Sequence, residues 1–199
     1  MNNTCYILRG LPGTGKSRLA RLISAANNPE YCHDGIHVET FSTDDLFINE
    51  EGVYEFEADM LKWHHEENLR RATEFISYGD VRKYFVDPRY GGVEGPEGET
   101  KWEYFLKNKD KETNMTRIAI IDNTNVQHWE YEPYVAAAKE AGWDVQIITL
   151  DWNEHDIPLY AKRTKHGVPE EAIQRMADRW EYPAGVMKFG SDEWRDTFA

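Results

Sequence analysis

The sequence predicts an α/β domain in which a short parallel β-sheet is flanked by helices on both faces. Short apolar runs alternate along the chain with longer stretches of helical periodicity, the order found in parallel sheets with helical crossovers. The run at 117–122 is apolar up to a final aspartate, as in a strand buried on both faces. A chain of 199 residues that is 40% hydrophobic is also long enough for one domain with a sizeable core.

Strand and helix patterns follow one another from the N-terminus. The expected strands are 4–9, 37–43, 117–122 and 143–150. The expected helices are 15–26, 56–79 and 128–142, followed by two more at the end of the chain. In the long pattern, apolar residues at helical spacing predict one buried face, formed by Phe56, Met60, Trp63, Leu69, Ala72 and Phe75.

Turn and cap residues place the last two helices. Asp156 and Pro158 suit the beginning of the first helix, and Gly167 follows its end. Pro169 suits the first turn of the second helix. We therefore expect the region 157–168 to form a short helix followed by a turn that contains Gly167.

One segment interrupts the alternation. Residues 80–116 are too many for an ordinary connection, and they contain the glycine-rich stretch 91–100. Residues 80–117 hold eight basic and eight acidic side chains, whereas the whole chain carries a net charge of -13. We interpret 80–116 as an insertion in a single domain that spans 1–199.

The first strand leads into a glycine-rich turn with the spacing G-x-x-x-x-G-K-[ST]. Glycines let backbone N–H groups converge on a phosphate, and the helix that follows adds its positive end. The strand before and the helix after distinguish a phosphate-binding loop from an ordinary turn. We therefore predict a P-loop NTPase fold that binds ATP and Mg²⁺. The nucleotide-binding residues are expected to be Gly10, Leu11, Pro12, Gly13, Thr14, Gly15, Lys16, Ser17 and Arg18.

Within this loop, two side chains carry the chemistry. Lys16 is expected to reach the β and γ phosphates, and the Ser17 hydroxyl is expected to bind Mg²⁺. Asp122, at the end of the apolar run 117–122, stands where such proteins hold Mg²⁺ with a carboxylate, often through water. A plain turn is the alternative for this position, because Asn123-Thr124-Asn125 is turn-prone.

A second acidic pair follows the second strand. Asp44 and Asp45 close the sequence Ser-Thr-Asp-Asp, and ligands of parallel sheets bind at the carboxyl ends of strands. One of these aspartates could accept the proton of an attacking hydroxyl. A helix N-cap is the other interpretation, since serine, threonine and aspartate are all common there.

Residues 160–168 form a basic cluster in an otherwise acidic chain. Lys162, Arg163, Lys165 and His166 lie within it. A solvated helix face would explain such a cluster. A small kinase, however, needs a mobile cationic lid that neutralises charge on the transferred phosphoryl group, and we expect 157–168 to be that lid.

Together these motifs resemble the polynucleotide-kinase-like branch of the P-loop kinases. The resemblance covers most of the chain outside 80–116. It rests on segments that occur in the family's order: RGLPGTGKS, STDD, YEF with a helix containing His65, Asn68 and Arg71, DNTN with QHWEYEPYV, and KRTKHGV with IQRM and RWE.

The resemblance implies a role for several residues. Lys16 and Ser17 match the triphosphate and Mg²⁺ residues, Asp44 matches the base that activates the acceptor hydroxyl, and Arg163 matches the lid arginine. Asn123 stands where phage-type members have an aspartate, and Asp122 precedes it by one residue. Phe47 stands where those members have an arginine that contacts the acceptor. Acceptor recognition therefore differs from theirs.

We expect an ATP-dependent kinase acting on a hydroxyl of a nucleic acid, with a 5′-hydroxyl end implied by the resemblance. The hydroxymethyl group of a modified base such as 5-hydroxymethyluracil, or a nucleoside or other small metabolite, would be alternative acceptors. A nucleotide-binding switch or ATPase module is an alternative of another class. Asp45, Asn123, Asn125, Arg89 and Lys101 are candidate acceptor contacts, the last two because cations and aromatics are interleaved in the insertion.

Composition narrows the setting. No apolar run approaches the ~20 residues that span a membrane, and no signal-peptide pattern is present. Cys5 and Cys32 are the only cysteines and form no metal cluster or disulfide framework. These features predict a cytoplasmic protein without a membrane partner, and they leave the oligomeric state open.

Overall fold

Four parallel strands form the centre of the protein. The computed structural model describes residues 2–27, 36–78 and 116–182. Its strands are β1 (Thr4–Arg9), β2 (Ile36–Phe41), β3 (Thr116–Asp122) and β4 (Asp144–Thr149). They form one sheet in the order β2-β3-β1-β4, and every neighbouring pair is parallel. The predicted α/β fold with a parallel sheet is confirmed.

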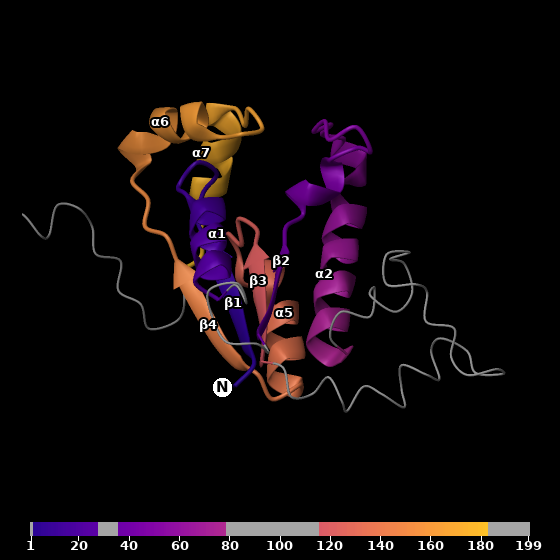
Figure 1. Ribbon diagram of the computed structural model, residues 1–199. Coiled ribbons are helices and arrows are strands. Elements are labelled where there is room, and N and C mark those ends of the chain that lie inside the picture. Colours follow the sequence, from indigo (N-terminus) through magenta and orange to yellow (C-terminus); the bar gives the residue numbers. More distant parts are fainter. Residues whose placement is uncertain (1, 28–35, 79–115, 183–199) are drawn as a thin grey trace, which may run out of the picture.

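Helices cover both faces of this sheet (Figure 1). α1 (Lys16–Ala26) lies on one face, and α2 (Leu61–Tyr78) and α5 (His128–Glu140) lie on the other. The period of two along β1 explains this arrangement. Cys5 and Ile7 pack with α2 and α5, whereas Leu8 packs with α1. Because β1 and β3 are buried on both faces, their sequences are almost continuously apolar.

The C-terminal helices sit over the phosphate-loop end of the sheet (Figure 1). A 3₁₀ turn η4 (Glu154–Asp156) leads into α6 (Ile157–Arg163), and α7 (Glu170–Asp178) follows. Asp156 is the N-cap of α6 and Pro158 lies in its first turn, as predicted, while Pro169 is the N-cap of α7 instead of a residue inside it. Ile157, Tyr160 and Ile173 bury their side chains against Leu11 and Val126, so these helices are anchored to the phosphate loop.

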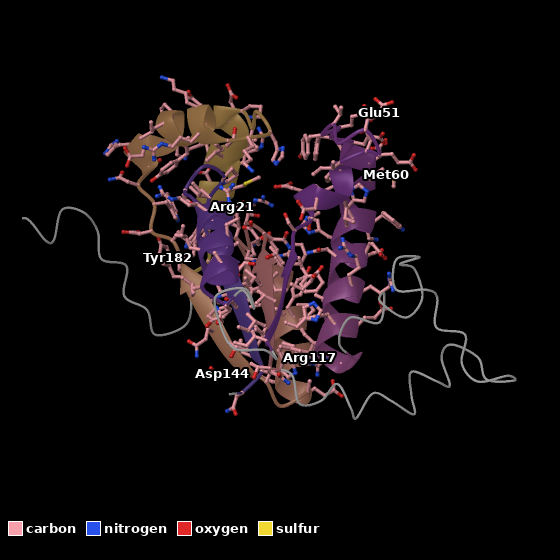
Figure 2. All side chains as sticks on the ribbon, in the orientation of Figure 1. Arg21, Glu51, Met60, Arg117, Asp144 and Tyr182 are labelled. Carbon is pink, nitrogen blue, oxygen red and sulfur yellow. The ribbon has the colours of Figure 1, made fainter. Side chains whose placement is uncertain are left out.

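The helix predicted over 56–79 begins later than expected. The short 3₁₀ helices η1 (Asp44–Phe47) and η2 (Ala58–Met60) precede it, and α2 begins at Leu61. Phe56 and Trp63 are more than half exposed, so the predicted buried face is wrong at this end. Glu51 and Met60 lie at the end of the molecule opposite Arg117 and Asp144, which stand near the beginnings of their strands (Figure 2). The start of α2 therefore lacks a sheet to pack against.

The remainder of α2 follows the prediction. Leu69, Ala72 and Phe75 pack with the α5-side core. The predicted insertion 80–116 lies outside the described residues except for Thr116, and so do Arg89 and Lys101. No helix in the described parts of the chain is long and apolar enough to cross a membrane.

Candidate active site

The phosphate loop joins β1 to α1 and depends on two glycines with positive φ. Gly13 has φ 80° and Gly15 has φ 103°, a region that residues with a side chain rarely adopt. Gly15 is the N-cap of α1 and provides no side chain to cap it. In the first helical turn the Arg18 N–H donates to the Gly15 carbonyl at 3.1 Å, whereas the N–H groups of Lys16 and Ser17 can donate to an anion, as at other phosphate-binding helix ends.

Helix α6 rests directly on this loop. A Cβ atom built on Gly13 would lie 2.2 Å from the backbone oxygen of Tyr160 in α6. Gly13 thus meets two demands at once, because it permits the loop's conformation and the close approach of α6. A phosphate bound in the loop would lie directly beside this contact.

Lys16 is a buried cation at the centre of the site. Its side chain is 8% exposed, and Nζ donates a hydrogen bond to the Leu11 carbonyl at 3.1 Å. Burial lowers its pKa from 10.5 to about 8, although the carboxylates of Asp122 and Asp44 act in the opposite direction. Both carboxylates therefore lie near enough to Lys16 to stabilise its charge.

Asp122 and Ser17 offer oxygen atoms suited to a magnesium ion. The Ser17 hydroxyl donates a hydrogen bond to the Asp122 carboxylate, and burial raises the pKa of Asp122. Its Oδ1 atom is buried and has no hydrogen-bond partner within the described residues. The described residues contain no group of three or more histidine, cysteine or acidic side chains that could hold a metal. The Ser17 hydroxyl and the Asp122 carboxylate are oxygen ligands of the kind that Mg²⁺ uses, since this ion is bound by one or two protein ligands together with substrate phosphates and water.

The turn after β2 is fixed by two hydrogen bonds to Thr43. Its N–H donates to Oδ1 of Asn123 at 2.9 Å, and its Oγ1 lies 3.2 Å from Nδ1 of His65. Thr43 is the N-cap of η1, yet its side chain makes no capping bond. The hydroxyl that would cap the helix is directed to α2 instead.

Asp44 and Asp45 begin η1 and are exposed. The pKa of Asp45 is raised, first because its carboxyl group loses part of its hydration and then because the carboxylates of Asp122 and Asp44 lie nearby. Acidic groups from the ends of β2 and β3 are thus brought together beside Lys16. Such a group of like charges is stable only with cations nearby, which a site for Mg²⁺ and ATP would gain on binding.

A family of AAA domains, AAA_33, matches residues 6–183. The chain belongs to this family. Human NEDD4-binding protein 2 is 33% identical over 177 residues, and human YLP motif-containing protein 1 is 27% identical over 176 residues. Each match covers 88% of this chain but 7% of the relative, so the chain spans a small part of these proteins.

A solved structure supports the fold of this AAA domain. Kti12 from Chaetomium thermophilum, in complex with ADP-AlF3, superposes with a TM-score of 0.52 and 14% identity, covering 94% of this chain and 85% of that chain. The family, the sheet order and the phosphate loop together make this a P-loop kinase-like domain.

The AAA domain places the two predicted asparagines differently. Asn123 is buried and serves the Thr43 turn. Asn125 is also buried, has a positive φ of 49°, and donates from Nδ2 to the Leu8 carbonyl at 2.7 Å. Asn125 therefore holds the end of β3 against β1, and the acceptor contacts proposed below do not use it.

The loop after α6 brings two residues of the predicted basic cluster, Lys165 and His166, to the site. Arg163 is the last residue of α6 and is exposed. The charge of Lys165 in the following loop lowers the pKa of Asp122. His166 stacks on Tyr54, with ring centroids 3.8 Å apart, and lowers the pKa of Asp45. The α6–α7 loop thus reaches across to the segment that follows β2.

Phe47, at the position where phage-type members have an arginine, is buried in this chain. Its side chain is 4% exposed and packs against Tyr54, Phe56 and His64. An arginine could not occupy this apolar position without losing its hydration. Phe47 therefore supports the folded segment 47–64.

Sequence reasoning placed Lys165 and His166 in the basic lid cluster without naming their partners, and it gave no role of their own to Tyr54 and His65; the fold brings all four to the site. Three of them lie within quoted family segments, YEF and KRTKHGV, and His65 lies in the helix that follows the first. The basic cluster pointed to Lys165 and His166 and the resemblance included Tyr54 and His65, but no spacing in the sequence indicates the contacts that these residues make.

Proposed function

We propose that this AAA domain is an ATP-dependent kinase that transfers the γ-phosphate to a hydroxyl of a nucleic acid. One observation carries the proposal. Lys16 of the phosphate loop lies within electrostatic reach of two carboxylates, Asp122 at the end of β3 and Asp44 after β2. An ATPase or a switch needs the first carboxylate, whereas a kinase also needs a base for its acceptor.

Each residue then has a distinct task. The phosphate loop and Lys16 bind the β and γ phosphates, and Lys16 stabilises charge during transfer. Ser17 and Asp122 would hold Mg²⁺, which would supply positive charge to neutralise the phosphates. Asp44 accepts the proton of the acceptor hydroxyl, whose oxygen bonds to the γ-phosphorus as the bond to ADP breaks.

The lid supplies further positive charge. Lys165, in the loop after α6, already acts on Asp122, and Arg163 is exposed at the end of α6. We propose that Arg163 turns toward the phosphates when ATP binds, where its planar guanidinium can hold two oxygens. Lys165 would neutralise charge from the opposite side of the lid loop.

The acceptor rests on the resemblance to polynucleotide kinases, which favours a 5′-hydroxyl end. The buried Phe47 removes the acceptor arginine of the phage-type members, so a hydroxymethyl group on a modified base is the second candidate. Asp45 lies beside the proposed base and is a candidate acceptor contact. Arg89 and Lys101 stay proposed contacts in the insertion.

Transfer of labelled phosphate from ATP to a panel of acceptors tests this proposal. The panel holds DNA and RNA oligonucleotides with 5′-hydroxyl ends, duplexes containing a hydroxymethylated base, and free nucleosides, and the labelled atom is then mapped. We expect turnover that depends on an oligonucleotide with a 5′-hydroxyl. Slow ATP hydrolysis that no acceptor changes would identify a switch or ATPase module instead. Asp44→Asn, which keeps the side chain's size, is the matched control.

A further inference from the structure

Thr43 has an unusual position for its side chain. It stands at the N-cap of η1, where a threonine hydroxyl usually accepts from a helical N–H group. In this protein the hydroxyl makes no such bond and instead lies 3.2 Å from Nδ1 of His65. Since Thr43 is 4% exposed, water cannot readily replace His65 as its partner.

The same residue is held from a second direction. The Thr43 N–H donates to Oδ1 of Asn123, which follows the metal-site aspartate at the end of β3. Asn123 in turn hydrogen-bonds to the Tyr134 hydroxyl, which accepts from Asn68 of α2. Thr43 is therefore connected to α2 through its side chain and to β3 through its backbone.

Asp44 is the residue that these connections orient. It follows Thr43 directly, and its own carboxylate is exposed. None of the hydrogen bonds found in the described residues ends on this carboxylate, which leaves it available to an acceptor. The direction of the Asp44 side chain is consequently set by the backbone at Thr43, and a small rotation there would move the carboxylate away from Lys16.

The protonation state of His65 suits this task. Burial of part of the ring lowers its pKa, the neighbouring His64 acts in the same direction, and Glu130 of α5 and Asp44 oppose the change. A neutral imidazole has one nitrogen that can accept a hydrogen bond. At neutral pH, Nδ1 can thus accept a hydrogen bond from the Thr43 hydroxyl.

We propose that His65 is a positioning residue, which holds the Thr43 turn so that Asp44 meets the acceptor hydroxyl. This role rests on the proposed kinase function. His65 does not touch the reacting atoms, and it acts through Thr43. Its loss should therefore reduce the rate of transfer and leave the binding of ATP unchanged, because the phosphate loop is built from other elements.

Two substitutions separate positioning from simple packing. In His65→Asn the amide oxygen occupies the place of Nδ1, whereas in His65→Gln the amide reaches the place of Nε2. We expect His65→Ala and His65→Gln to lower kcat by roughly 10–100-fold, since misplacing a base by about 1 Å has effects of this size. His65→Asn should retain kcat within about fivefold, and KM for ATP should stay within about twofold in all three.

Thr43→Val supplies the partner measurement. It should lower kcat about as much as His65→Ala, and the double variant should lose no more than either single one, because both remove the same contact. Glu66→Gln is the matched control on the exposed side of α2 and should leave kcat unchanged. Thermal unfolding of each variant shows whether it is folded.

The outcomes are distinct. Equal kcat for His65→Ala, His65→Gln and wild type would overturn the positioning role. The role would also be overturned if His65→Asn lowered kcat as much as His65→Ala and these losses in kcat added to that of Thr43→Val. A folded wild-type chain that transfers no phosphate to any acceptor would instead overturn the proposed function and, with it, this role. If His65→Ala does not fold, the comparison of kcat between His65→Asn and His65→Gln decides, because these two side chains differ by only one methylene.

Discussion

The middle of the sheet and its carboxyl edge, where the strands end, bury different kinds of side chain. In the middle, Cys5, Ile7, Ala119 and Ile121 are fully buried among apolar neighbours of α2 and α5. A few residues further along the same strands and loops, the buried side chains are polar or charged: Lys16, Ser42, Thr43, Asp122, Asn123 and Asn125.

The two regions differ in whether their buried side chains need hydrogen-bond partners and find them within the protein. The apolar middle requires no partners. At the edge, Oδ1 of Asp122 and Oδ1 of Asn125 have no hydrogen-bond partner within the described residues, and burial shifts the pKa values of Lys16 and Asp122 toward their neutral forms. Buried polar groups of this kind destabilise the ligand-free protein, and they interact strongly with a ligand that supplies the missing partner. Substitutions in the apolar middle should therefore lower mainly the free energy of unfolding, whereas substitutions at the carboxyl edge should lower mainly the rate of phosphate transfer.

The largest expected effect belongs to Lys16→Met, which removes the charge and keeps the shape. Phosphate transfer should fall by roughly 10³-fold or more, because a buried cation that stabilises transferring charge contributes several kcal/mol. The protein without nucleotide should be at least as stable as wild type at pH 7. Transfer assays and denaturant unfolding measure the two quantities, and near-normal turnover would refute the phosphate-loop assignment.

Ile121→Ala tests the other region. This side chain is fully buried in the α5-side core, and truncations of this kind destabilise proteins by roughly 2–5 kcal/mol. Unfolding in urea should show this loss, while kcat of the folded fraction stays within about threefold. A large fall in kcat with unchanged stability would show that the middle of the sheet and the edge are not separable.

Asp44→Asn and Asp45→Asn together compare two neighbouring carboxylates at the carboxyl edge. Loss of a general base usually lowers rates by about 10²-fold or more, so kcat should fall by that amount while ATP binding persists. Asp45→Asn should have a smaller effect, because Asp44 is the residue that matches the family's base. Steady-state kinetics with a saturating acceptor decide the matter. The reverse order of effects would shift the base by one residue.

The middle of the sheet was predictable from the sequence for a simple reason. Strands β1 and β3 and helix α1 follow from local periodicity, which depends on residues close together in the chain. The Gly10–Ser17 spacing is likewise local. The beginning of α2 failed because Phe56, Met60 and Trp63 continue the helical period past the region where the sheet can cover them.

The edge was only partly predictable, because its contacts join distant segments. Thr43 meets His65 and Asn123, which are 22 and 80 residues away in the chain. Tyr54 meets His166 from the lid. No periodicity encodes such pairs, and threonine before two aspartates looks the same whether its hydroxyl caps a helix or binds a histidine.

The smallest expected effect is a pH dependence that distinguishes the two regions by titration. The folded-state pKa of Lys16 is about 8, below its ordinary value of 10.5. Below pH 8 the lysine is charged in both states, and burying that charge destabilises the native protein. Between pH 8 and 10.5 the unfolded chain binds more protons than the native one, so this penalty is relieved as pH rises. Lys16→Met has no such titration. Its stability advantage over wild type should therefore shrink, by an amount on the order of 1 kcal/mol, as pH rises through 8.

The difference between the two proteins is the quantity to follow, because other groups titrate in the same range. Burial raises the pKa of Cys5, in the middle of the sheet, to about 12, which makes native stability fall at high pH in wild type and Lys16→Met alike. Subtracting their unfolding free energies from pH 7 to 9.5, without nucleotide, cancels that contribution and leaves Lys16. A difference that stays constant with pH would mean that Lys16 keeps its ordinary pKa, and that the edge holds its cation without cost. A difference that widens would reverse the sign of the argument, since it requires a native state that binds the proton more tightly than the unfolded chain.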